Sequence, residues 1–399
     1  MSKKSPQLRF EGFTDDWEER KLGDVLSERN DQTPETNEYP LMSFVQGKGV
    51  TPKGERYNRS FLVKDSEKKY KKTELGDFIY SSNNLETGSI GFNRTGKAVI
   101  SPVYSIFKSK KSRESQFIGI MSARKDFISK MVRFRQGVVY GQWRIHESDF
   151  LNIDMKMPND KEQQLIISFF ENIDKTIALH QRKLDLLKEQ KKGYLQKMFP
   201  KNGEKVPELR FAGFADDWEQ RKLNEVSDIY DGTHQTPKYQ DNGVMFLSVE
   251  NIKTLTSNKF ISREAFEDEF KIRPQRGDVL MTRIGDIGTA NVVETDEDLA
   301  YYVSLALFKS EELNPYFLQA SIYAPFVQDQ IWKRTLHIAF PKKINKNEIG
   351  QVPINVPTLA EQTKIGSFFK QLDNTITLHQ RKLDLLKEQK KGFLQKMFV

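Results

Sequence analysis

A short segment rich in arginine, glutamine and aromatic residues is the part of the chain best suited to hold a ligand by hydrogen bonds. Residues 133–144 read RFRQGVVYGQWR. Arginine and glutamine can each form two hydrogen bonds with the edge of guanine or adenine, and the glycines let a loop approach a duplex closely. The surrounding residues 101–150 carry ten Lys or Arg residues against four Asp or Glu residues. This composition favours contact with DNA over the alternative, a solvated basic surface.

Other polar and basic segments offer the same chemistry. SSNNLETGS at 81–89 places short polar donors on a predicted turn, and DGTHQTPKY at 231–239 is polar, basic and contains a glycine. Arg283 follows a strand-like run, and a second basic stretch extends from Arg334 to Lys346. Each of these segments could instead be an ordinary turn or a solvated surface. The candidate DNA-binding residues are Ser82, Asn83, Asn84, Arg94, Lys97, Arg133, Arg135, Gln136, Tyr140, Gln142, Arg144, Thr233, His234, Gln235, Lys238, Arg283, Arg334, His337, Lys342 and Lys343.

Residues that catalysis or metal binding would need are scarce. Cysteine is absent, which excludes disulfides, thiol catalysis and Cys-ligated metal sites, and the five histidines are scattered. GFNRTGKA at 91–98 differs from a phosphate-binding P-loop because Ala98 replaces the Ser or Thr that holds magnesium. Contact of Arg94 or Lys97 with a DNA phosphate is the better interpretation. We therefore predict a binding protein without catalytic residues, a metal or a cofactor of its own.

The chain contains an internal repeat. Residues 6–25 return at 207–226, and residues 179–199 return at 378–398 with one difference in 21 positions. Between these blocks the two halves diverge in sequence and share only short similar segments. A constant frame around variable inserts indicates that the inserts carry specificity, although ordinary drift after a duplication would also produce divergence.

Each copy of the second block belongs to a predicted long helix. Apolar residues recur there at alternating spacings of three and four over more than four heptads, and the seam includes Ile173, Ile177, His180, Leu184 and Leu187, repeated as Leu372, Ile376, His379, Leu383 and Leu386. The two seam histidines read as register residues rather than metal ligands. The outer face, KLDLLKEQKKG, is either a solvated helix face or a docking surface for other subunits.

The predicted fold class is α+β, with two globular recognition modules joined by two long helices. About 40 residues per helix give a length of roughly 60 Å. Antiparallel pairing of the helices as a coiled coil would relate the modules by a pseudo-twofold axis. The predicted segments are the modules at 1–158 and 200–357 and the helices at 159–199 and 358–399.

Composition limits the setting in which the protein works. The net charge is +8, which is compatible with nucleic acid as a partner. No run of 18 apolar residues exists, so we expect no membrane span, and the N-terminus lacks the apolar core of a secretory signal. A cytoplasmic location is expected.

These motifs together resemble the specificity subunits of bacterial type I restriction–modification systems. The resemblance rests on LRF-x-GF-x-DDWE-x-RKL in both halves, on Glu162–Gln163 and Glu361–Gln362 in the long helices, and on GTHQTPKY and GDVLMTR in the second module. It covers nearly the whole chain. The first module departs from the pattern because it lacks a GTH-type segment.

The resemblance implies a function and a set of partners. The modules would be target recognition domains, each reading one half of a bipartite, asymmetric sequence in double-stranded DNA. Two modification subunits would dock on the helices and methylate adenine with S-adenosylmethionine, and restriction subunits would translocate and cleave DNA with ATP and magnesium. This chain would supply none of these cofactors. The alternatives are a stand-alone sequence-specific DNA-binding regulator and a coiled-coil scaffold that binds no DNA.

Overall fold

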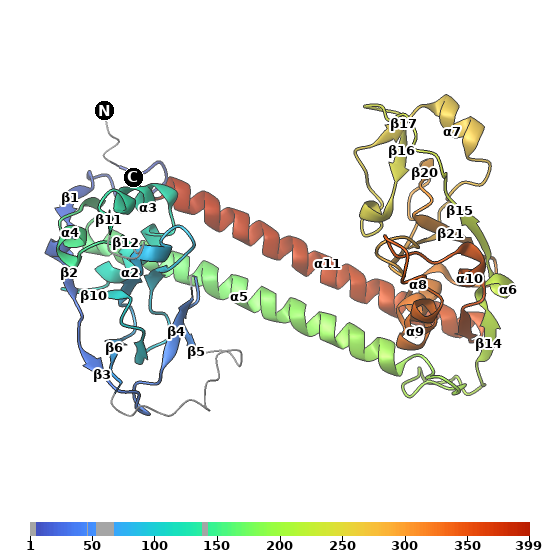
Figure 1. Cartoon of the computed structure of the whole chain (residues 1–399), viewed down its shortest axis with the longest axis horizontal. Helices are drawn as coiled ribbons and strands as arrows, with labels where there is room; N and C mark the ends of the chain where they lie inside the picture. Colours follow the sequence, from blue (N-terminus) through green and yellow to red (C-terminus); the bar gives the residue numbers. More distant parts are fainter. Residues whose placement is uncertain (1–4, 46, 53–67, 138–142) are drawn as a thin grey trace. The chain divides into compact units, whose positions relative to one another are not determined.

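The computed structural model describes residues 5–45, 47–52, 68–137 and 143–399 of the chain. Two residues predicted to contact DNA, Tyr140 and Gln142, lie outside these described residues. The chain forms two compact units (Figure 1), unit 1 from Met1–His180 and Lys382–Val399 and unit 2 from Gln181–Arg381. Within the described residues, no helix is both long and apolar enough to cross a membrane.

Unit 1 is built around a four-stranded antiparallel sheet of order β2-β10-β7-β8. Its strands are β2 (Leu26–Glu28), β10 (Ser105–Ser109), β7 (Phe78–Tyr80) and β8 (Ile90–Phe92). The smaller sheets are β3 (Gln32–Thr33) with β6 (Tyr70–Thr73) and β9 (Ala98–Ile100), β4 (Met42–Val45) with β5 (Gly49–Pro52), β1 (Glu18–Lys21) with β13 (Asp154–Met157), and β11 (Gln136–Gly137) with β12 (Trp143–Arg144). The short helices are α1 (Leu22–Val25), η2 (Ser82–Asn84), α2 (Glu114–Met121), α3 (Lys125–Val132) and α4 (Glu147–Leu151).

Unit 2 repeats this plan with a different second sheet. Its four-stranded sheet has the order β15-β21-β18-β19, from β15 (Asp228–Asp231), β21 (Leu305–Lys309), β18 (Val279–Thr282) and β19 (Ala290–Val292). The other strands are β17 (Phe260–Ile261), β16 (Val244–Leu247) and β20 (Leu299–Tyr301) in one sheet, and β14 (Glu219–Lys222) with β22 (Pro353–Val356). The short helices are α6 (Leu223–Val226), η4 (Val249–Asn251), α7 (Arg263–Glu269), α8 (Pro315–Tyr323), α9 (Pro325–Lys333) and α10 (Lys346–Gly350). The shared strand order confirms the predicted repeat and the α+β class.

The long helices are α5 (Asp160–Lys197) and α11 (Leu359–Lys396). The boundary between the units falls inside both of them, so each unit contains one module, part of α5 and part of α11. The division predicted from the sequence, with boundaries after residues 158, 199 and 357, stays a prediction.

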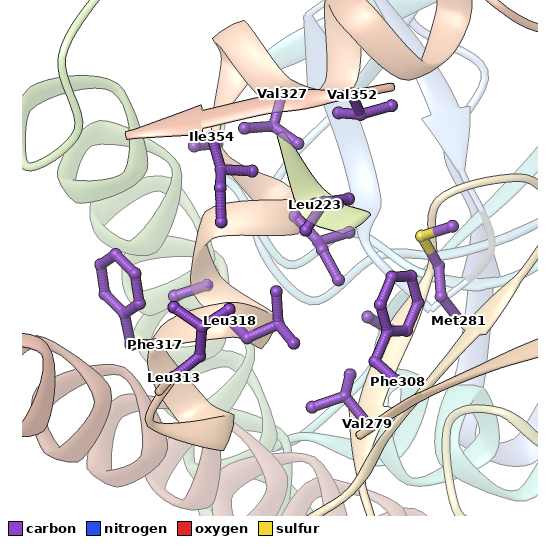
Figure 2. Packing of buried hydrophobic residues seen from close by; sticks show 14 of the residues in the cluster. Leu223, Val279, Met281, Phe308, Leu313, Phe317, Leu318, Val327, Val352 and Ile354 are labelled. Carbon is purple, nitrogen blue, oxygen red and sulfur yellow. The ribbon is translucent and has the colours of Figure 1, made fainter. Parts of the chain in front are cut away.

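The two inner strands of each main sheet are buried on both faces. In unit 2, Val279 and Met281 of β18 pack with Phe308 and with Phe317 of α8 in one core (Figure 2), whereas Leu280 points into the core under β16 and β20. Side chains alternate between the two faces of a strand, so a strand covered on both sides must be apolar throughout. This burial accounts for the strand-like run GDVLMT, where four successive residues are buried.

Within each unit, the parts of α5 and α11 run antiparallel. In unit 1, Phe169 stacks edge-on against Phe393 at 4.9 Å between ring centroids, and Asp174 pairs with Lys390 at 2.5 Å. Unit 2 repeats both contacts as Tyr194–Phe368 at 4.9 Å and Lys191–Asp373 at 2.6 Å. Residue numbers rise in one helix as they fall in the other. The predicted seam residues are buried or half-buried, and Leu184, Leu187 and Leu383 are fully enclosed.

The repeated motifs of the sequence meet one another in space. Arg9, from the LRF motif, donates two hydrogen bonds to Glu162 of α5, at 2.8 and 2.7 Å. Arg210 makes the same paired bonds to Glu361 of α11, at 2.7 and 2.8 Å. Both glutamate side chains are 1% exposed. A bidentate pair removed from water in this way is strong and fixes geometry, so it anchors each N-terminal segment to the start of a long helix.

Each of these two segments also forms a backbone hydrogen bond with the last turn of the other long helix. The amide of Leu8 donates to the carbonyl of Lys396 at 2.9 Å, and the amide of Leu209 donates to the carbonyl of Lys197 at 2.8 Å. Each frame segment therefore joins the first turn of one long helix to the last turn of the other within its unit. This junction explains why both blocks of the sequence repeat together.

We predict that Glu361→Gln lowers the free energy of unfolding of unit 2 by about 3 kcal/mol, because the buried guanidinium of Arg210 loses its counter-charge. The measurement is the midpoint of denaturant unfolding. Asp296→Asn provides the control, since Asp296 is exposed and pairs with Arg276 at 2.7 Å on the surface of the same unit, where an ion pair contributes little to stability. Equal effects of the two substitutions would contradict an anchoring role for the buried pair.

Candidate nucleic-acid interface

Each module carries a hairpin between its last two short helices. In module 2 we call residues 334–345, between α9 and α10, hairpin 2. Its two arms meet where the amide of Leu336 donates to the carbonyl of Lys343 at 2.7 Å. In module 1 we call the described residues 133–137 and 143–146, between α3 and α4, hairpin 1. Strands β11 and β12 form its arms, with Gln136 paired to Arg144. The basic segments singled out in the two halves therefore occupy matching places.

In module 2, hairpin 2 is bonded to the loop that follows β18. The amide of Ile344 donates to the carbonyl of Arg283 at 2.9 Å, and the amide of Gly285 donates to the carbonyl of Lys342 at 2.8 Å. The side chain of Arg283 is buried and reaches in two directions. It pairs with Asp231 at 2.5 Å and donates to the carbonyl of Ile344 at 3.1 Å. One guanidinium thus ties together the ends of β15 and β18 and the base of hairpin 2.

This placement gives Arg283 a clear structural role. Its Nε and Nη1 groups donate to the Ile344 carbonyl and to Asp231 inside the module, so it acts as a positioning residue for the loops around it. A direct contact between Arg283 and DNA stays a prediction. The sequence offered no sign that Asp231 would be the partner, because 52 residues separate the two along the chain.

The segment 231–239 begins at the end of β15 with two tightly packed residues, Gly232 and Thr233. A Cβ atom at Gly232 would lie 2.4 Å from the carbonyl oxygen of Tyr301, so only glycine fits there. Thr233 is buried, and its hydroxyl is bonded to Glu269. Three predicted DNA-binding residues follow Thr233, and all of them are exposed: His234, Gln235 and Lys238.

Module 1 connects its loops through side chains instead of backbone bonds. Asn83 accepts a hydrogen bond from the amide of Trp143 at 2.6 Å, and Ser82 accepts one from the amide of Ile145 at 3.0 Å. Arg135 donates two bonds, each 2.7 Å long, to Glu86, which lowers the pKa of that carboxyl group. Four of the predicted residues in this module, Ser82, Asn83, Arg135 and Arg144, therefore lie in or against hairpin 1.

The remaining predicted residues of module 1 have separate surroundings. Gln136 donates to Asp149 at 3.1 Å, and Asn84 is exposed beside Asn83. Arg94 pairs with Asp174 of α5 at 2.8 Å, and Lys97 pairs with Glu38 at 2.5 Å. Arg133 lines a cavity with Lys130, Met155 and Val399. Arg94, Lys97 and Arg133 thus contact other parts of unit 1, and their contact with DNA stays a prediction.

The basic face of hairpin 2 contains residues that the sequence did not single out. Residues 331–346 hold five Lys or Arg residues and no Asp or Glu. Trp332 of α9, which was not predicted, packs against His337 in a tilted arrangement with 4.1 Å between ring centroids, and it lies under the ammonium of Lys342 at 4.7 Å. Arg334 is half-buried and donates to Gln330 at 2.8 Å. The only signal for Trp332 was its position beside this charge run.

The arrangement suits binding better than catalysis. Among the described residues, no group of three or more His, Asp or Glu side chains could hold a metal ion. Together the two modules instead present exposed Lys, Arg, Gln, Asn and His side chains on loops that hydrogen bonds hold in place. Cationic side chains bind phosphates without regard to sequence, and loop amides and guanidinium groups can distinguish base edges.

Comparison with known proteins agrees with this repeated plan. Residues 14–189 and 215–388 each match the family model described as "Type I restriction modification DNA specificity domain". The type I restriction enzyme MjaVIII specificity subunit of Methanocaldococcus jannaschii is 22% identical, over 95% of this chain and 91% of the relative. The crystal structure of the S subunit of a type I restriction-modification system from M. genitalium superposes with a TM-score of 0.66 at 13% identity, over 99% of both chains.

A second solved structure has the same fold. It comes from work on complex assembly and conformational transition of the type I R-M system, and it superposes with a TM-score of 0.52 at 17% identity over 96% of this chain and 97% of that chain. At such identities these two structures establish likeness of fold, and the family match covers both halves of the chain separately.

We predict that Arg283→Met lowers the free energy of unfolding of unit 2 by about 2 kcal/mol, because Asp231 is left without its partner in a half-buried site. Hydrogen exchange should become faster at Ile344 and across residues 231–239. Lys343→Met is the control, since Lys343 is exposed and the change should leave both measurements unaltered. Unchanged exchange in Arg283→Met would show that the guanidinium does not hold these loops.

Proposed function

The chain belongs to the type I restriction modification DNA specificity family, and from this premise we propose that its two modules each read one half of a bipartite, asymmetric DNA target. The chain is the DNA sequence-specificity subunit of a type I restriction–modification complex and carries no catalytic role of its own. Because its target is DNA in the cytoplasm, we place the complex there.

One observation carries the proposal for the modules. Both modules hold a basic hairpin at the same place in the same strand order, yet they fix it with different residues. Ser82 and Asn83 bind hairpin 1, whereas Arg283 with Asp231 binds hairpin 2. The frame around them is nearly identical in sequence. An asymmetric target with two different halves requires two modules with different amino-acid sequences, held on one constant frame.

The kinds of exposed side chain suggest which residues would contact DNA phosphates and which would contact the bases. Lysines such as Lys238, Lys342 and Lys343 would contact phosphates, which gives affinity that falls steeply with salt. Exposed His234, Gln235 and Gln136 have the hydrogen-bonding groups that base edges recognise, and each good bidentate contact contributes about 1–3 kcal/mol of discrimination. Changing a module would change the target half without changing the frame.

Two equivalent docking surfaces for modification subunits would lie on the long helices. Unit 1 exposes Leu179 and Leu385, and unit 2 exposes the matching pair, Leu378 and Leu186. Exposed leucines outside the seam are typical of a surface that another helix covers. We assign one modification subunit to each pair. S-adenosylmethionine would bind to these partners, and restriction subunits would join with ATP and magnesium.

Replacing residues 18–158 by the corresponding module of another specificity subunit should change one half of the methylated sequence and leave the other half as it was. The reason is that each module is held by its own frame contacts and reads DNA through its own loops. Sequencing of methylated adenines in a host that carries the chimaera provides the measurement. A change in both halves, or in neither, would refute the modular proposal.

A gel shift separates this function from its alternatives. The chain should bind its split target with modification subunits present. Tight sequence-specific binding by the chain alone would favour a stand-alone regulator. If the chain binds no DNA, with or without the modification subunits, the coiled-coil scaffold is the remaining alternative.

The double substitution Leu186→Glu with Leu378→Glu should leave complexes that hold one modification subunit in place of two, because the charged side chains would have to be buried at that surface. Native mass spectrometry gives the stoichiometry. Leu75→Glu, at an exposed leucine of module 1, is the control and should retain both subunits. Retention of both subunits by the double variant would show that these leucines do not form the docking surface.

A further inference from the structure

The tip of hairpin 2 (residues 338–341) exposes two large apolar side chains completely. Ile338 is 99% exposed and Phe340 is 104% exposed. Among the described residues, the other exposed large apolar side chains reach at most 65%. Leaving these two side chains in water is unfavourable, so their position calls for a partner that covers them.

Several contacts hold the base of the hairpin, whereas the side chains at its tip are fully exposed. Trp332 is held between His337 and Lys342, and His337 is also within hydrogen-bond distance of the Trp332 carbonyl at 2.9 Å. Thr335 donates to the carbonyl of Ile331 at 2.8 Å. Together with the backbone bonds to the loop after β18, these contacts fix both arms. In this arrangement the tip points away from the module and does not fold back onto it.

The charge around the tip identifies the partner as a polyanion. Lys342, Lys343 and Lys346 are exposed, and none of them has a carboxylate partner within the described part of the chain. No acidic residue occurs between 331 and 346. An apolar tip flanked by lysines fits a duplex, whose phosphates meet the cations and whose stacked bases offer an apolar interior. The tip is also continuous with the loops assigned above to DNA recognition.

We propose that Phe340, supported by Ile338, is a wedge that enters the base stack of the half-site read by module 2 and opens one base step. This inference rests on the proposed function. Apolar side chains that enter a duplex partly unstack a step and kink the DNA, and the extra surface that the bent DNA contacts offsets the cost. Pyrimidine–purine steps unstack most easily, so the wedge adds specificity for such a step without a hydrogen bond to its bases.

The test uses the full chain assembled with its modification subunits and a duplex that carries the target found by sequencing methylated adenines. The half-site of module 2 is the half that remains when residues 18–158 are exchanged. The probe is 2-aminopurine, placed in turn at positions of this half-site other than the methylated adenine. The wild-type complex should raise its fluorescence at one step, because unstacking relieves quenching.

Three variants make the result decisive. Phe340→Ala should abolish the fluorescence rise and weaken binding about tenfold, and Phe340→Leu should retain part of both. Lys343→Ala should weaken binding while the fluorescence rise remains, because it removes only a phosphate contact. Thermal unfolding should be unchanged in all three, since both residues are exposed.

The outcomes separate failure of the wedge from failure of the function. Specific binding by the wild-type complex without a fluorescence rise overturns the wedge, as does a Phe340→Ala variant that keeps the rise. Loss of the modification subunits from Phe340→Ala would show that the tip contacts protein, which also overturns it. If the wild-type complex neither binds nor methylates any specific duplex, the proposed function itself falls.

Discussion

The buried ion pair between an arginine of the N-terminal segment and a glutamate at the start of a long helix is the contact on which the rest of the molecule depends. It occurs twice, as Arg9–Glu162 and Arg210–Glu361, with both glutamates almost completely enclosed. A charge buried without its partner is costly, so neither residue can vary alone. The pair fixes where each module begins relative to the long helix that follows it.

The constancy of the frame leaves the modules free to differ. Lys191–Asp373 and Asp174–Lys390 are the same interhelical pair seen in the two repeats, and each sets the register of α5 against α11 within its unit. Inside the modules, the shared strand order places the two hairpins at equivalent positions. Ser82 and Asn83 bind hairpin 1, whereas the Arg283–Asp231 pair holds hairpin 2. A protein built in this way can vary the loops of its modules without disturbing the contacts that hold its frame.

Sequence patterns predicted the parts of the structure that depend on local order. The heptad spacing located both helices, which begin at Asp160 and Leu359. The side chains of Asn159 and Thr358, one residue before each start, accept hydrogen bonds from the amides of Glu162 and Glu361. Charge counting singled out the basic segments that form the two hairpins of the structure. It could not separate Arg144, which is exposed, from Arg135, whose guanidinium is engaged by Glu86, because that contact joins residues far apart along the chain.

By itself, the sequence determined that this protein has two halves, a constant frame and basic variable loops, because repetition, periodicity and charge are properties of neighbouring residues. Only the tertiary structure decided which polar side chains face the solvent. Packing joins Arg283 to Asp231 across 52 residues and buries a side chain that looked free, while it leaves Phe340 bare at the tip of a hairpin. Burial is a property of the folded surface, which depends on contacts between distant segments, and no local pattern contains it.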